Sequence, residues 1–543
     1  MVEKVGFKAV LIYPDFDTQN TFWSYSESLS MYAPKNEFGL AKRLLPPLGL
    51  MGLFNHLKPY YEQIILLDKN IDPRPLATFI NDASHVYMGG MLAQEKNLLK
   101  YAREVKVAGK VLIVGGTAIT PQSPLIDIAD HLVENEAEGV IDELLSGLKK
   151  GNARKYYKGG VGSAENFFQP DYAAINMQNY VHMAVQISRG CPEACEFCDI
   201  PSRFGKAYRV TPWQKTEQAF RQMKQLGWTG QVFVVDDNFI GHPKKTLQVL
   251  KNLYQIGENI AYHHPKYTEL TLRLADNTAI MKEVRYWFHK ARFINGFYGV
   301  ETPNTASLLE TKKRQNLRGD RSLEEKLNFI AEQTGSGIMM GMIYGFDHDS
   351  NESVAEFVNF VNASNAPIVM AGLLNALPCT PLMSRLQKSG RLIQASSGNN
   401  SDGVINFIPY NFSIQQAEQN YLSILQGIYT SKAYFVRVMR HLKQIDPQLY
   451  SKPSEESTLN YLIKILSRKN ARIFWRYLPQ AVAIAYQRCG LNTHAFKALL
   501  SEYFSLCAQY THFKAQINVQ RKQIAKREYA PWQQCSWREQ QEE

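Results

Sequence analysis

Two series of short apolar runs that alternate with helical patterns constrain the fold of this chain of 543 residues. In the first series the apolar runs lie at residues 7–16, 64–67, 85–88 and 111–114. In the second series six such runs lie at residues 181–188, 231–235, 267–272, 296–301, 338–344 and 368–374. Short buried strands that alternate with helices predict βαβ units, and therefore parallel sheets. We expect an α/β protein.

The two series predict separate domains. The first predicts an N-terminal doubly wound, Rossmann-like domain over residues 1–150, with helices expected at about 48–58, 92–107 and 122–131. Residues 151–178 have the composition of a linker. The second series predicts a partial (β/α)6 barrel over residues 179–400, with helices expected at 212–226, 243–256, 276–290, 305–332 and 350–363. Residues 401–543 show mainly helical patterns and are expected to form a helical C-terminal domain.

Three of the seven cysteines are clustered and point to a metal site. Cys191, Cys195 and Cys198 have the spacing C-x3-C-x2-C and directly follow the first expected barrel strand. Three thiolates on one loop can bind three irons of a [4Fe–4S] cluster and leave the fourth iron open to a small ligand. A structural zinc site needs four protein ligands, and neither a fourth cysteine nor a histidine is near. The other cysteines are scattered and receive no role: Cys379, Cys489, Cys507 and Cys535.

The cysteine motif, with Phe197 before its last cysteine, resembles the signature of the radical S-adenosylmethionine (SAM) superfamily. In that superfamily the open iron binds the amino and carboxylate groups of SAM, and a 5′-deoxyadenosyl radical abstracts hydrogen from an unactivated carbon. The wider sequence resembles the cobalamin-binding radical SAM enzymes, and most of all the branch that contains the hopanoid C-2 methylase. The stretches that carry this resemblance are Thr21–Ser24, Pro46–Leu50, Cys198–Pro201, Val235–Gly241, Gly299–Pro303, Gly345–Asp347 and Gly372–Pro378.

The resemblance places contacts to SAM at the ends of the barrel strands. Asp236, Asp237 and Asn238 follow the second strand, where two adjacent carboxylates need a cation or hydrogen-bond donors, and the amino group of SAM is such a cation. A turn or a helix cap is the alternative. Glu269, in the third strand, either contacts SAM or substrate or faces solvent. On later strands the resemblance implies a polar contact from Glu301 and close packing of adenine at Gly341 and Gly345.

Glycines at the ends of the N-terminal strands mark the expected cobalamin site, unless they simply serve the turns. The resemblance implies these contacts: Gly89, Gly90 and Met91 for the corrin; then Gly115, Gly116 and Thr117; and Glu136 and Glu138 for the nucleotide tail. The D-x-H-x-x-G motif that supplies a histidine ligand to cobalt in some methyltransferases is absent. We therefore expect cobalamin to be held without a lower histidine ligand from the protein.

Together these features predict a radical SAM C-methyltransferase with a [4Fe–4S] cluster, SAM and cobalamin, and a hopanoid-type polycyclic lipid as the substrate. Modification of a tetrapyrrole, a peptide or another natural product, with or without methyl transfer, is an alternative. A non-catalytic cobalamin or redox sensor is a further one. An enzyme of this kind needs a reductant protein such as ferredoxin or flavodoxin.

The positive charge of the chain is concentrated near its C-terminus. The formal net charge is +11, and residues 431–543 contain 18 Lys and Arg against 8 Asp and Glu. Basic, aromatic-rich helices such as the one expected over residues 458–487 can lie on an anionic membrane, although helices that merely cap the barrel would look the same. Nucleic-acid binding is not favoured. With neither a signal peptide nor a long apolar segment in the sequence, we expect a cytoplasmic protein, with peripheral contact at the inner face of a membrane.

Overall fold

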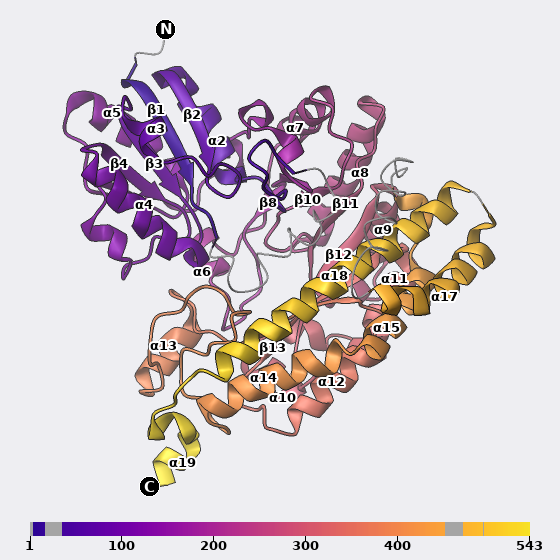
Figure 1. Ribbon diagram of the computed structural model, residues 1–543. Coiled ribbons are helices and arrows are strands. Elements are labelled where there is room, and N and C mark those ends of the chain that lie inside the picture. The colour runs from indigo at the N-terminus through magenta and orange to yellow at the C-terminus, as the bar shows by residue number, and fades with distance from the viewer. Residues whose placement is uncertain (1–3, 17–34, 451–470, 492, 543) are drawn as a thin grey trace.

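The structure, a computed structural model, describes residues 4–16, 35–450, 471–491 and 493–542 (Figure 1). The family-like stretch Thr21–Ser24 and residues 458–470 of the basic stretch lie outside the described residues.

Six parallel strands form the N-terminal sheet in the order β2-β1-β3-β4-β5-β6. They are β1 (Gly6–Tyr13), β2 (Tyr61–Asp68), β3 (His85–Gly89), β4 (Val111–Gly115), β5 (His131–Glu134) and β6 (Tyr156–Lys158). Val10 and Ile12 of β1 pack into a core on one face, and Ala9 and Leu11 pack into a core on the other. Burial on both faces explains the continuous apolar runs and confirms the doubly wound fold. The α-helices of this domain are α2 (Leu48–Leu57), α3 (Ala77–Ile80), α4 (Glu95–Val107) and α5 (Ile141–Lys150).

Two parts of this domain differ from the sequence-based expectation. The prediction of a helix over residues 122–131 is wrong. The stretch forms a single 3-10 turn, Pro124–Asp127, and then strand β5. The side chain of Asp130 binds Lys106 and the amide of Leu112, and this contact draws the chain into the sheet instead of a helix. Strand β6 lies in the stretch expected to be a linker and completes the sheet.

The second sheet also has six parallel strands, and they follow one another in sequence order. They are β7 (Met183–Val185), β10 (Val232–Val234), β11 (Lys266–Leu270), β12 (Phe293–Glu301), β13 (Gly337–Tyr344) and β14 (Ile368–Leu373). The first and last strands are not paired with each other, so the barrel is partial, as expected. Between the strands lie α7 (Trp213–Gln225), α8 (Pro243–Asn259), α9 (Ala279–Lys290), α10 (Thr305–Glu310), α11 (Leu323–Thr334) and α12 (Ser353–Ala363).

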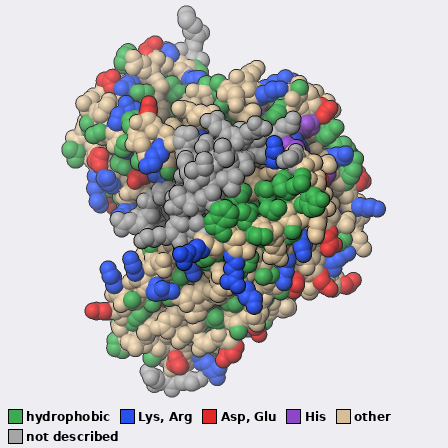
Figure 2. Space-filling model, turned by 45° about the vertical axis from the view of Figure 1, so that its right-hand side comes forward, with side chains coloured by type: hydrophobic (Ala, Val, Ile, Leu, Met, Phe, Trp, Pro, Cys, Tyr) green, Lys and Arg blue, Asp and Glu red, His purple; other side chains and the backbone are tan. Residues whose placement is uncertain are grey.

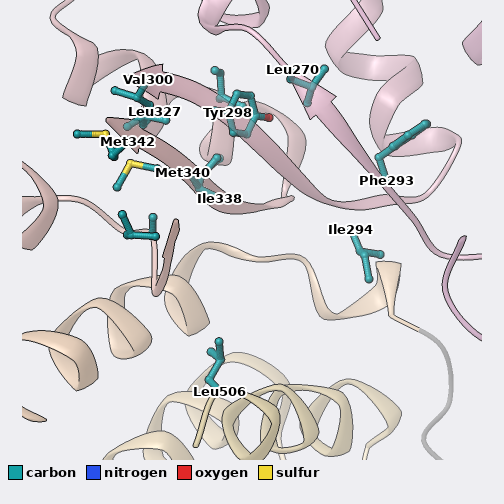
Figure 3. Close-up of a cluster of buried hydrophobic side chains, with 14 of the residues drawn as sticks. Leu270, Phe293, Ile294, Tyr298, Val300, Leu327, Ile338, Met340, Met342 and Leu506 are labelled. Carbon is teal, nitrogen blue, oxygen red and sulfur yellow. The ribbon is translucent and has the colours of Figure 1, made fainter. Parts of the chain in front are cut away.

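Alternation along the barrel strands separates a helix-covered outer face from an inner face. Tyr298 and Val300 of β12 and Met340 of β13 are buried, and they pack in one cluster with Leu327 of α11 (Figure 3). The intervening residues of both strands are only half-buried. The helix expected over residues 305–332 is divided into α10 and α11, because Ser322 and Glu325 form a capping box that starts a new helix.

The C-terminal region is helical, as predicted, and packs beside the barrel. Helix α13 (Pro381–Lys388) precedes it, and the α-helices described after residue 400 are α14 (Ile414–Ile428), α15 (Ser431–Gln444), α17 (Ala471–Cys489), α18 (His494–Ile524) and α19 (Trp537–Glu542). Stacked rings of Phe435 and Tyr477, 4.5 Å apart, join α15 to α17. The long helix α18 runs along the outside of this group (Figure 1). Within the described residues, no helix is long and apolar enough to cross a membrane.

Candidate functional site

The cysteine loop lies between a two-stranded antiparallel pair, β8 (Ser188–Arg189) with β9 (Arg209–Val210), and the short helix α6 (Ile200–Phe204). Gly190, with φ +89°, starts the loop, and a Cβ atom there would overlap the carbonyl oxygen of Ala207. Cys191 and Cys195 are buried and Cys198 is half-buried. Burial raises the pKa of all three thiols, so metal binding must displace their protons.

Polar groups from distant parts of the chain surround these sulfur atoms. Asn238 Nδ2 donates to Cys191 Sγ at 3.7 Å, and Gln315 Nε2 donates to Cys195 Sγ at 3.3 Å. Such hydrogen bonds to the cysteine sulfurs tune iron–sulfur clusters. No group of three His, Cys, Asp or Glu side chains among the described residues is arranged to hold a single metal ion. A cubane cluster instead takes one thiolate for each of three irons, so the donor set fits a [4Fe–4S] cluster.

Asp236 and Asp237 both fix the start of the cysteine loop. Asp236 accepts hydrogen bonds from the amides of Ile187 and Ser188, at 2.8 and 2.9 Å, and from the Ser188 hydroxyl at 2.6 Å. These bonds give Asp236 a structural role at the start of the loop, and its contact with SAM stays a prediction. Asp237 accepts from the amide of Gly190 at 2.7 Å. Burial raises the pKa of Asp236 to about 7 and that of Asp237 to about 6.

Glu301 is aimed into the barrel by a break in the sheet. The register between β12 and β13 shifts between Gly299 and Glu301, and Glu301 has φ +68°. Its Oε1 lies 2.6 Å from Nζ of Lys313, and both side chains are buried. Burial alone would lower the pKa of Lys313, but Glu301 and the neighbouring Cys195 raise it well above its usual range. The carboxylate and the ammonium thus form an ion pair beside the cysteine loop.

Glu269 lies on the inner face of the barrel strands, where its side chain is exposed, and its contact with SAM or substrate stays a prediction. The preceding inward residue on its strand, Tyr267, stacks on Phe233 with the ring centroids 4.6 Å apart. Desolvation, together with the nearby carboxylates of Asp237 and Glu301, raises the pKa of Glu269 to about 7. Three acidic groups therefore lie near one another at the mouth of the barrel; Lys313 pairs with Glu301, and a further cation would relieve the remaining repulsion.

The two glycines expected to pack against adenine both have structural partners. A Cβ atom on Gly341 of β13 would lie 3.0 Å from the ring of Phe297 on the neighbouring strand β12. The glycine therefore leaves room for this aromatic ring. Gly345 has φ +114°, and its amide donates to Asp349 Oδ2 at 2.9 Å. Contact of these positions with adenine stays a prediction.

A pocket of about 480 Å³ lies between the carboxyl ends of the N-terminal strands and the barrel. It brings together all the residues expected to contact cobalamin: Gly89, Gly90, Met91, Gly115, Gly116, Thr117, Glu136 and Glu138. Val185, Gln186 and Arg189 line it from the barrel side. Gly116 has φ +94°, and a Cβ atom there would lie 2.7 Å from the carbonyl oxygen of Gly90. Gly116 therefore lets the loops that follow β3 and β4 approach each other closely at the edge of the pocket.

The carboxylates of Glu136 and Glu138 join the two domains. Glu136 Oε2 lies 2.8 Å from Nη1 of Arg209, and Glu138 Oε1 lies 2.7 Å from Nη2 of Arg189. Arg189 immediately precedes Gly190, and its guanidinium group also covers the ring of Phe167 at 4.1 Å. The expected contact of these glutamates with a nucleotide tail stays a prediction, since their described partners are arginines of the cysteine loop.

No histidine is found among the described residues that line the pocket. His85 begins β3, at the other end of the strand from Gly89, and its ring pairs with the hydroxyl of Tyr61 at 3.1 Å. Burial lowers the pKa of His85 to about 4. His56 pairs with Asp142 and His131 with the carbonyl oxygen of Arg154. Each of these histidines therefore has a described partner away from the pocket, and the lack of a lower histidine ligand stays a prediction.

Known proteins resemble this chain in fold and in sequence. The cobalamin-dependent radical SAM enzyme OxsB, solved with aqua-cobalamin bound, covers 97% of this chain and 82% of its own length, with a TM-score of 0.56 and 13% identity. TsrM from Kitasatospora setae, solved with cobalamin and a [4Fe–4S] cluster, covers 96% of this chain and all of its own (100%), with a TM-score of 0.55 and 10% identity. Residues 380–526 match a domain of unknown function, DUF4070.

Two curated relatives are methyl-transferring enzymes by name. The hopanoid C-2 methylase of Rhodopseudomonas palustris is 28% identical over 64% of this chain and 66% of its own length. An uncharacterized methyltransferase of Synechocystis sp. is 31% identical over 97% of this chain and 95% of its own length. The chain belongs to the cobalamin-type radical SAM methyltransferases. The α/β fold with a helical C-terminal part agrees with this family.

In this methyltransferase two residues near the cysteines were not apparent from the sequence. Lys313 and Gln315 stand more than a hundred positions after the motif, in a stretch that was expected to be one long helix and that carries no sign of a contact with the cysteines. Only the fold places them against Cys195 and Glu301. The pairing of Arg189 and Arg209 with the glutamates of the N-terminal domain could not be predicted from the sequence either, because ion pairs between domains leave no local sequence pattern.

The raised pKa of Glu269 predicts a measurable pH dependence. Between its unfolded value near 4.5 and about 7 the folded protein binds the extra proton, so the carboxylate makes stability fall as the pH rises through this range. Glu269→Gln removes this effect. We expect the melting temperature of the cofactor-free variant to exceed that of the wild type at pH 8 and to approach it at pH 5. Glu283→Gln on the surface of α9 should change neither value, and an unaltered pH profile in Glu269→Gln would contradict the assignment.

Proposed function

We propose that the chain is a cobalamin-dependent radical SAM enzyme that methylates an unactivated carbon of a hopanoid-type polycyclic lipid. One juxtaposition carries the proposal: the glycine-lined pocket of the N-terminal domain opens against the arginine that starts the cysteine loop. Such a reaction needs the site of radical formation and the site of methyl supply next to each other, so that both can reach one substrate.

The residues divide between the cofactors. Cys191, Cys195 and Cys198 hold the [4Fe–4S] cluster. Asp237, Asn238, Glu269 and Glu301 surround the SAM that its open iron binds, and Phe197 packs beside Lys313. The pocket holds cobalamin. When bound, the cluster and SAM supply the hydrogen-abstracting radical, and cobalamin supplies the methyl group.

The protein contributes binding and charge. Desolvation by burial raises the pKa values of Glu269 and Asp237, and the ammonium group of SAM is a cation that would favour their charged forms. The ion pair between Glu301 and Lys313 keeps the third carboxylate fixed.

The inner face of the barrel supports an apolar substrate. Five half-buried side chains lie on alternate, inward positions of its strands: Phe233, Tyr267, Phe297, Met339 and Met370. Aromatic and thioether side chains suit a rigid hydrocarbon, which presents much apolar surface and few polar groups. The 28% identity with a hopanoid C-2 methylase points to the same class of substrate.

The C-terminal helices support contact with a membrane that carries such a lipid. Helix α17 exposes Arg472, Trp475 and Arg476, and one face of the molecule shows hydrophobic side chains beside a row of Lys and Arg (Figure 2). Basic and aromatic side chains together favour an anionic membrane surface.

The experiment uses reconstituted protein with SAM, cobalamin, dithionite and a hopanoid without the 2-methyl group. We expect a methylated hopanoid, with 5′-deoxyadenosine and S-adenosylhomocysteine in equal amounts, because one SAM gives the radical and another restores the methyl group. The Cys191→Ala variant is the control. Absence of 5′-deoxyadenosine would reject the enzyme class and favour a sensor. Formation of 5′-deoxyadenosine without a lipid product would reject the lipid as the substrate.

Bacteriochlorophyllide d would then be the next substrate to test, since a bacteriochlorophyllide d C-12(1)-methyltransferase of Chlorobaculum tepidum is 21% identical over 72% of this chain.

A further inference from the structure

One flank of the cysteine loop lies at the protein surface. Cys195 is only 8% exposed, but its neighbour Ala194 and the preceding Pro192 are exposed. The chain that follows α10 lies directly on this flank, since the amide of Glu196 donates to the carbonyl oxygen of Thr311 at 2.9 Å. The site of the cluster is therefore shallow on this side.

The segment from residue 312 to residue 318 has an inward and an outward set of side chains. Lys313 and Gln315 are buried and contact Glu301 and the Cys195 sulfur. Lys312, Arg314 and Arg318 are exposed, and no ion pair joins them to any described acidic side chain. The same few residues thus touch the cluster site from inside and carry three cations outside.

We propose that Lys312, Arg314 and Arg318 form the docking surface for an acidic one-electron carrier protein that reduces the cluster. This inference rests on the proposed function, because it assumes that the three cysteines hold a [4Fe–4S] cluster. One electron passes from the reduced carrier, which is oxidised, to the cluster, which is reduced, and no bond or proton is exchanged. Clustered cations steer an acidic partner and hold it over this exposed flank of the cysteine loop.

The surroundings of the three cations favour a protein over a membrane. The neighbouring acidic residue Glu310 is bound by Arg385, 3.0 Å away, and Asp320 is a single exposed carboxylate beside the cations. Leu309 is 49% exposed next to them and offers the apolar contact that protein interfaces have at their centre. Residues 305–320 contain no aromatic residue, whereas membrane-bound surfaces are rich in Trp and Phe.

The test variant reverses the three charges, Lys312→Glu, Arg314→Glu and Arg318→Glu together. Reduced flavodoxin is the probe, and binding and the rate of cluster reduction are measured at low and high salt. We expect the variant to bind flavodoxin at least about tenfold more weakly at low salt and to be reduced correspondingly more slowly, with the difference shrinking at high salt. Reduction by dithionite should be as fast as in the wild type, which shows that the cluster and its loop are intact.

A matched variant carries the same change of charge elsewhere. Arg521, Lys522 and Lys526 are exposed on or just after α18, and their replacement by glutamate should leave flavodoxin binding unchanged. Equal loss in both variants would mean that net charge alone attracts the carrier and would overturn the proposal, as would unchanged binding in the first variant. The proposal would also be overturned if the first variant lost binding to anionic phospholipid vesicles and kept its binding to flavodoxin. If wild-type protein cleaves no SAM even with dithionite, the proposed function fails, while flavodoxin binding still reports on the surface.

Discussion

Replacing Cys191 with alanine is expected to abolish the cleavage of SAM. Each of the three thiolates binds its own iron, and no fourth cysteine lies in the motif to replace a lost one. The iron content of the reconstituted protein should fall from about four per chain to well below one, and 5′-deoxyadenosine should become undetectable. Iron analysis and chromatography of the reaction products measure both.

Cys535→Ala is the matched control for this prediction. Cys535 is half-buried in the C-terminal region, outside the motif, and its replacement should leave iron content and SAM cleavage as they are in the wild type. Continued formation of 5′-deoxyadenosine by the Cys191→Ala protein would contradict the assignment of the cysteine loop as the catalytic cluster site.

Replacing Lys313 with methionine is expected to destabilise the barrel strongly. Methionine fills a similar volume but leaves the buried carboxylate of Glu301 without its partner. Breaking a buried ion pair in this way typically costs about 3–5 kcal/mol in free energy of unfolding. Urea denaturation should show the change as a lower midpoint of the transition that reports on the barrel.

The neighbouring residue gives a control within the same segment. Lys312 is exposed, so Lys312→Met should shift the urea midpoint very little. Adding Glu301→Gln to Lys313→Met removes the unpaired charge and should recover much of the lost stability. Equal midpoints for Lys313→Met and the wild type would show that the pair is not buried as described.

Much of the fold could be predicted from the sequence because its signals are local. The six barrel strands were placed within a few residues of their observed ends, since each is a short apolar run bounded by turn residues. The prediction of a helix over residues 122–131 was wrong because contacts with distant residues determine the structure there. The Asp130 side chain binds Lys106 of α4 and the amide of Leu112 in β4. Strand β6 was missed because three residues of an edge strand carry almost no periodicity.

The candidate site divides in the same way. The C-x3-C-x2-C motif determines the cluster by itself, because three ligands on one short loop are close in any fold. The glycines of the pocket were also predictable, since carboxyl ends of parallel strands meet at one edge. The role of Asp236 was not, because its oxygens are taken by a loop that begins nearly fifty residues earlier.

The sequence alone thus determined the parallel α/β architecture, the cysteine loop and the glycine-lined edge of the N-terminal sheet, because these depend on the spacing of nearby residues. The tertiary structure alone decided that Lys313 pairs with Glu301, that Gln315 reaches Cys195, and that arginines of the cysteine loop bind the glutamates of the other domain. Burial and charge pairing between distant segments set these contacts, and neither leaves a pattern along the chain.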